Sequence, residues 1–227
     1  KKKEFLREIS KIQGVYVPSL YDVTYNEDGT IKEFKPKYED VPAKVKKRIV
    51  NNFDKVDFPL DMIVPYSEIV HDRVVLETSR GCTNGCRFCQ AGMIYRPVRE
   101  KTTNTLLDQA DKMIKATGYQ EVSLASLSIC DYSDIQNLVS TLILEHGKKN
   151  VGVALPSIRV DAFSVDLIKE IQKVRKTGLT FAPEAGSQRM RDIINKGLTE
   201  ERILEATKNA FESGWSTIKL YFILGLP

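Results

Sequence analysis

Residues 74–89, VVLETSRGCTNGCRFC, place a short apolar segment directly before a loop that carries three cysteines. We expect a strand at Val74–Thr78, after which Cys82, Cys86 and Cys89 follow in a C-x3-C-x2-C spacing. Three cysteines within eight residues are typical of metal binding in a reducing compartment rather than of a disulfide framework. This stretch therefore predicts a metal site at the end of the first strand of a larger domain.

Strands and helices alternate along the rest of the chain. The resulting five strand-then-helix units, the last incomplete, imply a parallel sheet with right-handed crossovers. We expect an α/β fold, a partial or full parallel βα-barrel with active groups in the loops after the strands, while an open doubly wound sheet is the alternative. Apolar periodicity and stop signals predict further strands at Glu121–Leu127, Val151–Leu155, Leu179–Ala182 and Thr217–Leu224, and helices at Thr103–Thr117, Asp134–Gly147, Val165–Lys176, Gln188–Asn195 and Glu200–Glu212.

The number of cysteines in the loop is informative. Cysteine thiolates are the usual protein ligands of iron–sulfur clusters, and four of them close a [4Fe–4S] cube. Three thiolates leave one iron open to a small chelating molecule, as an open zinc position is left to a substrate. Gly81 and Gly85 would let the backbone curl tightly around such a cluster. We therefore expect Cys82, Cys86 and Cys89 to be the metal ligands.

A C-x3-C-x-aromatic-C loop, with Phe88 as the aromatic, resembles the radical S-adenosylmethionine (radical SAM) superfamily. The resemblance implies that the amine and carboxylate of S-adenosylmethionine chelate the open iron, and that Phe88 contributes to cofactor binding. It further implies that the reduced cluster cleaves the sulfonium to a 5′-deoxyadenosyl radical, which abstracts hydrogen from a substrate. A flavodoxin or ferredoxin would then be the reducing partner.

The loops after the second and third strands add residues by the same resemblance. Ser126 and Ser128 lie where the superfamily carries a Gly-Gly-Glu-like segment that takes the methionyl amine; the glycine pair and the acid are absent here. Arg159 is implied to clamp the cofactor carboxylate through its guanidinium, and a salt bridge with Asp161 or Glu184 is the alternative.

The segments after the fourth and fifth strands resemble one branch of the superfamily. Residues 183–187, PEAGS, are similar to the Glu-Ser-Gly-Ser-like segment of cobalamin-linked and methylthiotransferase-type enzymes, which implies that Glu184 accepts from ribose hydroxyls. Ser187 is expected to cap the next helix. Lys196, before a glycine as in that branch, would meet cofactor or substrate, or only complement a helix end. Leu224, before the final Gly-Leu-Pro, is implied to pack on adenine.

Residues 1–70 carry no recognisable chemistry and are expected to form an N-terminal extension or linker. We predict a helix at residues 3–13, a hairpin of Val15–Tyr25 and Thr30–Tyr38 around Asp28-Gly29, and a short helix within 39–60. Residues 71–227 would be the radical SAM core, truncated at its C-terminal end. A cobalamin-binding domain, if one exists, would lie upstream of residue 1.

Composition limits the other functions. The chain has no apolar run of about 18 residues and no signal peptide, so a cytoplasmic location without membrane contact is expected. The net charge of +4 argues only weakly for nucleic acid, and RNA, protein or a small molecule all stay open as substrates of a transferase-type reaction. Two alternatives are an iron–sulfur electron-transfer module and a zinc-stabilised RNA-binding domain, with His71 or His146 as the fourth ligand. Cys130 is expected to be a small buried residue.

Overall fold

The computed structural model describes residues 1–156, 159, 169, 171 and 178–226. The chain divides into two compact units, residues 1–51 and 52–227. The predicted boundary at residue 70 differs from this division, because residues 52–62 pack with the second unit. Phe58, Leu60 and Met62 contact its main hydrophobic core.

The first unit holds one helix and one hairpin. Helix α1 spans Lys2–Ser10 and ends before the predicted residue 13. After the short 3-10 helix η1 (Pro18–Leu20), strands β1 (Tyr21–Tyr25) and β2 (Ile31–Pro36) pair antiparallel, which confirms the predicted hairpin. Leu20 and Tyr21 are buried in a small core with Val17 and Val41.

The short helix predicted within residues 39–60 is wrong. This stretch contains no helix or strand in the structure. Its buried apolar positions are Val41, which joins the core of the first unit, and Phe53, which belongs to the second. Because the two anchors lie twelve positions apart and belong to different units, no continuous apolar face is available to stabilise a helix between them.

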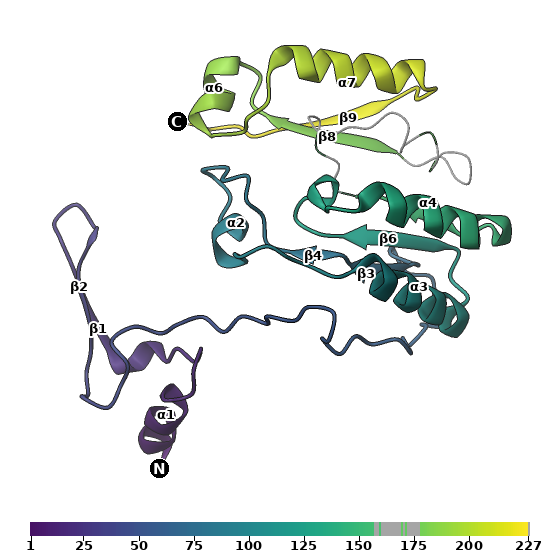
Figure 1. The fold of residues 1–227 in the computed structure, drawn as a ribbon. Helices are drawn as coiled ribbons and strands as arrows, with labels where there is room; N and C mark the ends of the chain where they lie inside the picture. Colours follow the sequence, from purple (N-terminus) through teal and green to yellow (C-terminus); the bar gives the residue numbers. More distant parts are fainter. Residues whose placement is uncertain (157–158, 160–168, 170, 172–177, 227) are drawn as a thin grey trace. The chain divides into compact units, whose positions relative to one another are not determined.

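The second unit is built on a parallel sheet. Strands β3 (Val74–Glu77), β6 (Glu121–Ala125) and β7 (Gly152–Ala154) pair in the order β3-β6-β7, all parallel. Figure 1 labels β3 and β6 of this sheet. Helices α3 (Thr103–Thr117) and α4 (Ile135–His146) supply the crossovers and bury their apolar faces on this sheet. The alternation predicted from the sequence is confirmed here, and the loops after β3 and β6 leave the same sheet edge.

A second parallel pair follows further along the chain. Strand β8 (Leu179–Glu184) pairs with β9 (Ile218–Phe222), and helices α6 (Gln188–Ile193) and α7 (Glu200–Glu212) lie between them in sequence. Ser187 accepts a hydrogen bond from the Met190 amide, which confirms its predicted role as the N-cap of α6. The helix predicted at Val165–Lys176 lies outside the described residues apart from isolated positions. No helix of the described residues is long and apolar enough to cross a membrane.

Candidate cluster loop and cofactor site

The three-cysteine loop leaves and rejoins the domain through a small antiparallel ladder. Strand β4 (Ser79–Arg80) pairs with β5 (Arg99–Glu100), and helix α2 (Ala91–Ile94) lies inside the loop that they enclose. Thr78, between β3 and β4, donates its amide to the carbonyl of Ala125 at 3.0 Å and accepts from the amide of Lys101 at 2.9 Å. The base of the loop is therefore joined directly to the ends of β3 and β6.

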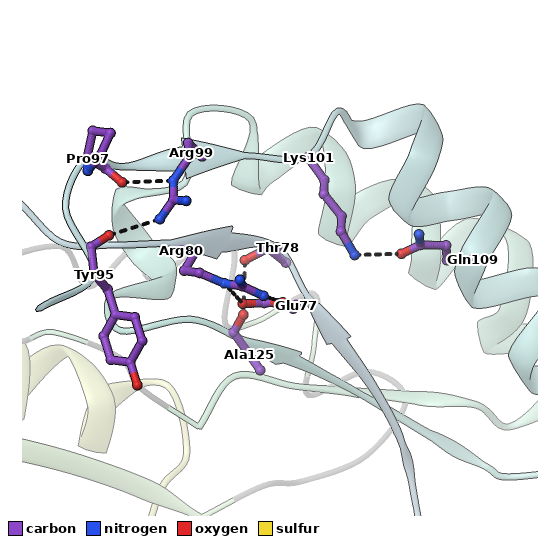
Figure 2. Close-up of polar contacts among 9 residues, drawn as sticks. All are labelled: Glu77, Thr78, Arg80, Tyr95, Pro97, Arg99, Lys101, Gln109 and Ala125. Carbon is purple, nitrogen blue, oxygen red and sulfur yellow. Dashed lines mark hydrogen bonds and ion pairs between the residues drawn. The ribbon is translucent and has the colours of Figure 1, made fainter. Parts of the chain in front are cut away.

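Side chains reinforce this base (Figure 2). Arg80 makes a bidentate ion pair with Glu77, at 2.7 and 2.8 Å, and its guanidinium lies 5.0 Å from the ring centroid of Phe53. Arg99 donates to the carbonyls of Pro97 and Tyr95, each at 3.0 Å, and so closes the return of the loop. Charge-assisted bonds of this kind are stronger than neutral ones.

Lys101 follows β5 and is buried, with only 1% of its surface exposed. Its ammonium donates to Gln109 Oε1 at 3.1 Å and lies 4.0 Å from the ring centroid of Phe58. Burial lowers the pKa of the Lys101 ammonium below its ordinary value. Next to it, the Thr102 amide donates to Asp54 at 2.7 Å. Residues 53–58 thus contact both β4 and the residues that follow β5, and these contacts brace the base of the loop.

The cysteines themselves are half-buried. Cys82, Cys86 and Cys89 are free thiols of intermediate exposure, and the Cys89 amide donates to the carbonyl of Cys86 at 3.0 Å. Gly81 has φ +103°, and a Cβ there would lie 2.8 Å from two backbone carbonyl oxygens of the returning chain. Only glycine fits this turn, which brings Cys82 close against the returning strand.

The donor set fits an iron–sulfur cluster. Each thiolate of a [4Fe–4S] cube binds a different iron, so the three sulfurs need not converge on one point. Within the described part of the chain, no three His, Cys, Asp or Glu side chains lie close enough together to hold a single metal ion. His71 is exposed before β3, and His146 is buried at the end of α4. Cys130 packs against the main core but is half-buried, so the expectation of a buried residue is met only in part.

The end of α6 holds the loop from a second side. The Arg87 amide donates to the carbonyl of Ile194 at 2.9 Å, and the Arg87 guanidinium donates to that of Ile193 at 2.6 Å. Asn195, in the left-handed region at φ 54°, donates its side-chain amide to the carbonyl of Gly85 at 2.9 Å. The segment that the sequence analysis singled out around Lys196 therefore contacts the cysteine loop directly.

Three of the predicted cofactor residues come together at this junction. Glu184 ends β8 with φ 66°, a conformation rarely adopted by residues other than glycine, asparagine and aspartate. Its carboxylate lies 3.1 Å from the ammonium of Lys196, and that ammonium lies 6.0 Å from the ring centroid of the exposed Phe88. The structure thus connects the cluster loop to the loop after β8 through a charged pair.

Ser126 and Ser128 lie at the carboxyl end of β6. Within the described residues, neither hydroxyl has a hydrogen-bond partner, although both oxygens are buried. Ser126 lines a cavity of about 530 Å³ together with Glu77, Gly81 and Tyr95. Buried polar groups are normally satisfied, so the unpartnered Ser126 hydroxyl beside this cavity is suited to meeting a ligand.

The other two predicted residues are Arg159 and Leu224. Arg159 is half-buried after β7, and Ser157, Ile158, Val160 and Asp161 lie outside the described residues. Leu224 follows β9 and is 93% exposed. Their roles stay predictions.

Arg191 is a structural residue that the sequence analysis missed. It lies on α6, is 1% exposed, and donates to the carbonyls of Ala185, Gly186 and Leu198 and to Gln188. It therefore fixes the turn that follows Glu184. An arginine within an amphipathic helix gives no sequence signal for such a role, because most are solvated.

Comparison with known proteins decides the family. The protein-family model described as "Radical SAM superfamily" matches residues 76–227, two thirds of the chain. The chain belongs to the radical SAM superfamily. Its members use a [4Fe–4S] cluster and S-adenosylmethionine. The resemblance stated from the cysteine loop is confirmed.

Radical SAM relatives of several kinds match the chain. An uncharacterized protein of Methanocaldococcus jannaschii, MJ0966, is 33% identical over 81% of this chain and 40% of its own. An uncharacterized methyltransferase of Pyrococcus horikoshii, PH0819, is 23% identical over 99% and 47%. A further relative, from Chlorobium phaeobacteroides, is named tRNA-2-methylthio-N(6)-dimethylallyladenosine synthase. Transferase names thus recur among these relatives, and the chain spans less than half the length of the first two.

A solved structure supports the fold. The cobalamin-dependent S-adenosylmethionine radical enzyme OxsB aligns with 88% of this chain and 28% of its own, with a TM-score of 0.54 and 19% identity. This likeness confirms the predicted α/β fold with a TIM-like radical SAM core.

Proposed function

We propose that Cys82, Cys86 and Cys89 hold the [4Fe–4S] cluster of this radical SAM chain and leave one iron open to S-adenosylmethionine. The observation that carries the proposal is the loop itself: three half-buried thiols lie between β4 and β5, at the carboxyl ends of β3 and β6. When bound and reduced, the cluster supplies the electron that cleaves the cofactor sulfonium. The protein's own contribution is to fix this loop and to orient the cofactor.

Orientation of the cofactor is assigned to the groups around the loop. The free hydroxyls of Ser126 and Ser128 are suited to accept from the methionyl ammonium, and the adjacent cavity has room for part of such a ligand. Glu184 would accept from ribose hydroxyls, with the ion pair to Lys196 holding its carboxylate in place at the junction. Phe88 would cover the same region.

Three further residue and cofactor assignments extend the proposal. Arg159 would bind the cofactor carboxylate, and Leu224 would pack on adenine. Cobalamin is a further proposed cofactor, for which the cobalamin-dependent neighbour OxsB gives the precedent. A flavodoxin or ferredoxin would reduce the cluster, and a cytoplasmic location stays a prediction.

For the substrate, the charge distribution favours RNA over the other two classes. Residues 1–51 contain 12 Lys and Arg and 8 Asp and Glu, a net charge of +4, so residues 52–227, with 22 of each, are neutral. The run KVKKR at 44–48 is largely exposed. Such a run is suited to contact phosphates. Binding of transfer RNA that weakens when residues 44, 46 and 47 are changed to Gln would support this; unchanged binding and unchanged salt dependence would refute it.

The central proposal is tested by anaerobic reconstitution with iron and sulfide. Wild-type protein should take up about four irons and four sulfides per chain. With a reductant it should release 5′-deoxyadenosine from S-adenosylmethionine. Cys86→Ala should lose both properties, and Cys130→Ala, which removes a thiol outside the loop, should keep them.

The same experiment separates the alternatives. Zinc in place of iron would refute the proposal in favour of a zinc-stabilised domain. A cluster that forms but never cleaves the cofactor in the whole protein would instead favour an electron-transfer module. Wild-type iron content in Cys86→Ala would remove the assignment of the ligands.

A further inference from the structure

One side-chain amide in the cysteine loop contacts a proposed ligand sulfur. Asn84 Nδ2 lies 3.2 Å from Cys82 Sγ and 2.8 Å from Asp131 Oδ2. A side-chain amide carries two hydrogens, so it can donate one to the sulfur and the other to the carboxylate. Cys82 Sγ and Asp131 Oδ2 therefore do not compete for the same hydrogen.

Asp131 belongs to a different loop, and its backbone is fixed. It ends the 3-10 helix η2 (Ile129–Asp131), which directly follows β6. The Asp131 amide donates to the carbonyl of Ser128 at 3.2 Å, and Ile129 is fully buried in the main core. A carboxylate anchored to the sheet thus holds the amide of Asn84 against Cys82.

The other side of Asn84 is held as well. Its backbone carbonyl accepts from the Asn195 side chain at 3.4 Å, next to the shorter bond from Asn195 to Gly85. Rotation of the residue as a whole is restricted, so the direction of its side chain is set by the contact with Asp131. Asn84 is thereby a fixed donor rather than a mobile surface amide.

We propose that Asn84 raises the reduction potential of the cluster by donating a hydrogen bond to the Cys82 thiolate, and that Asp131 is the positioning residue that directs it. This inference rests on the proposed function, in which Cys82 binds iron. A donor at a ligand sulfur withdraws negative charge and stabilises the reduced cluster, which carries one more electron. Removing it makes reduction harder.

The test is a redox titration of the reconstituted protein without S-adenosylmethionine, followed by electron paramagnetic resonance. Asn84→Ala and the near-isosteric Asn84→Asp, which lacks the N–H donor, should both have midpoint potentials more negative than the wild type. Thr83→Ala, at the exposed neighbouring position, is the matched control and should keep the wild-type potential.

A double-mutant cycle isolates the role of Asp131. Asp131→Ala removes a negative charge and also releases the amide, so its effect on the potential should differ between the Asn84 and Asn84→Ala backgrounds. Equal effects in both backgrounds would overturn the positioning role. If Asn84→Ala fails to retain its cluster, the same comparison can be made with Asp131→Ala in the Asn84 and Asn84→Asp backgrounds. Asp131 lies outside the cysteine loop, so its substitution changes no residue of that loop.

The outcomes distinguish the inference from the proposal beneath it. A cluster-loaded Asn84→Ala or Asn84→Asp with an unchanged potential would overturn the inference alone. A wild-type protein that takes up no cluster would overturn the proposed function and the inference with it.

Discussion

The ammonium of Lys196 lies 3.1 Å from a carboxylate oxygen of Glu184, and the two side chains are only 12% and 16% exposed. A largely buried pair of this kind is held in one geometry, because separating the charges leaves each poorly solvated. The pair also lies beside Phe88 of the cysteine loop, through the ammonium of Lys196. This position underlies the proposal that the pair binds a cofactor between the cysteine loop and the loop after β8.

We expect Lys196→Met to weaken binding of S-adenosylmethionine by about tenfold, or about 1.4 kcal/mol. The variant leaves the Glu184 carboxylate without its partner, so that carboxylate no longer keeps its orientation. Cluster content should not change, since no cysteine is touched. Anaerobic calorimetric titration of the reconstituted protein measures the affinity.

The control for this variant is Lys208→Met. Lys208 forms an exposed pair with Glu212 on α7, at 3.8 Å, and such pairs contribute little. Lys196→Arg should restore most of the affinity. Wild-type affinity in Lys196→Met would show that the pair does not contact the cofactor.

The contact between Asn195 and the cysteine loop leads to a second prediction. Asn195→Gly keeps the left-handed backbone but removes the amide that donates to Gly85. We expect the free energy of unfolding to fall by about 1 kcal/mol. The cluster should be lost several-fold faster to an iron chelator, because the loop is no longer held at that point.

Asn150→Gly is the matched control for loop docking. Asn150 also has a positive φ, 58°, and ends the 3-10 helix η3 (Gly147–Lys149) after α4. It should leave the chelation rate unchanged. Equal rates for Asn195→Gly and the wild type would mean that Arg87 alone suffices to dock the loop.

Much of the fold could be read from local signals. Helix α3 begins and ends where the sequence predicts, because the Thr102 side chain accepts from the Thr105 amide and Gly118 ends the helix at φ 72°. Helix α7 likewise matches its predicted bounds, with Thr199 as its N-cap. These caps act within a few residues, so they are visible in sequence.

The contacts that complete the site are not local. Strands β4 and β5 have two residues each, too few to give a periodic pattern. Asn195 and Gly85 are 110 positions apart, and only the folded chain brings them together. Sequence motifs singled out Glu184, Lys196 and Phe88 one by one. Only the structure shows that the three side chains lie close to one another.

Arg191 is expected to be among the most sensitive positions for stability. Arg191→Met removes the donor for three carbonyls and Gln188, and leaves buried acceptors unpaired. We expect the free energy of unfolding to fall by about 3 kcal/mol in chemical denaturation. Arg189→Met, two residues earlier in α6 and exposed, should change it by less than about 0.5 kcal/mol. A small effect of Arg191→Met would indicate that water replaces the guanidinium.

Lys101 predicts a specific dependence of stability on pH. Its folded-state pKa lies below the ordinary value of 10.5, because burial disfavours the charged form. Between the two pKa values the unfolded chain binds more protons than the folded chain, so the Lys101 contribution to stability rises with pH and is complete above about 10.5. Lys101→Met has no proton to lose and should lack this rise.

Urea denaturation at a series of pH values from 7 to about 10.5 measures the effect as the difference between wild type and variant. Tyr132 and other groups titrate in both proteins and cancel in that difference. Lys115→Met, at an exposed position of α3, should give a curve parallel to the wild type. A wild-type curve parallel to that of Lys101→Met would place the Lys101 ammonium in water rather than against Phe58, and the brace formed by residues 53–58 would then rest on Asp54 and Phe53 alone.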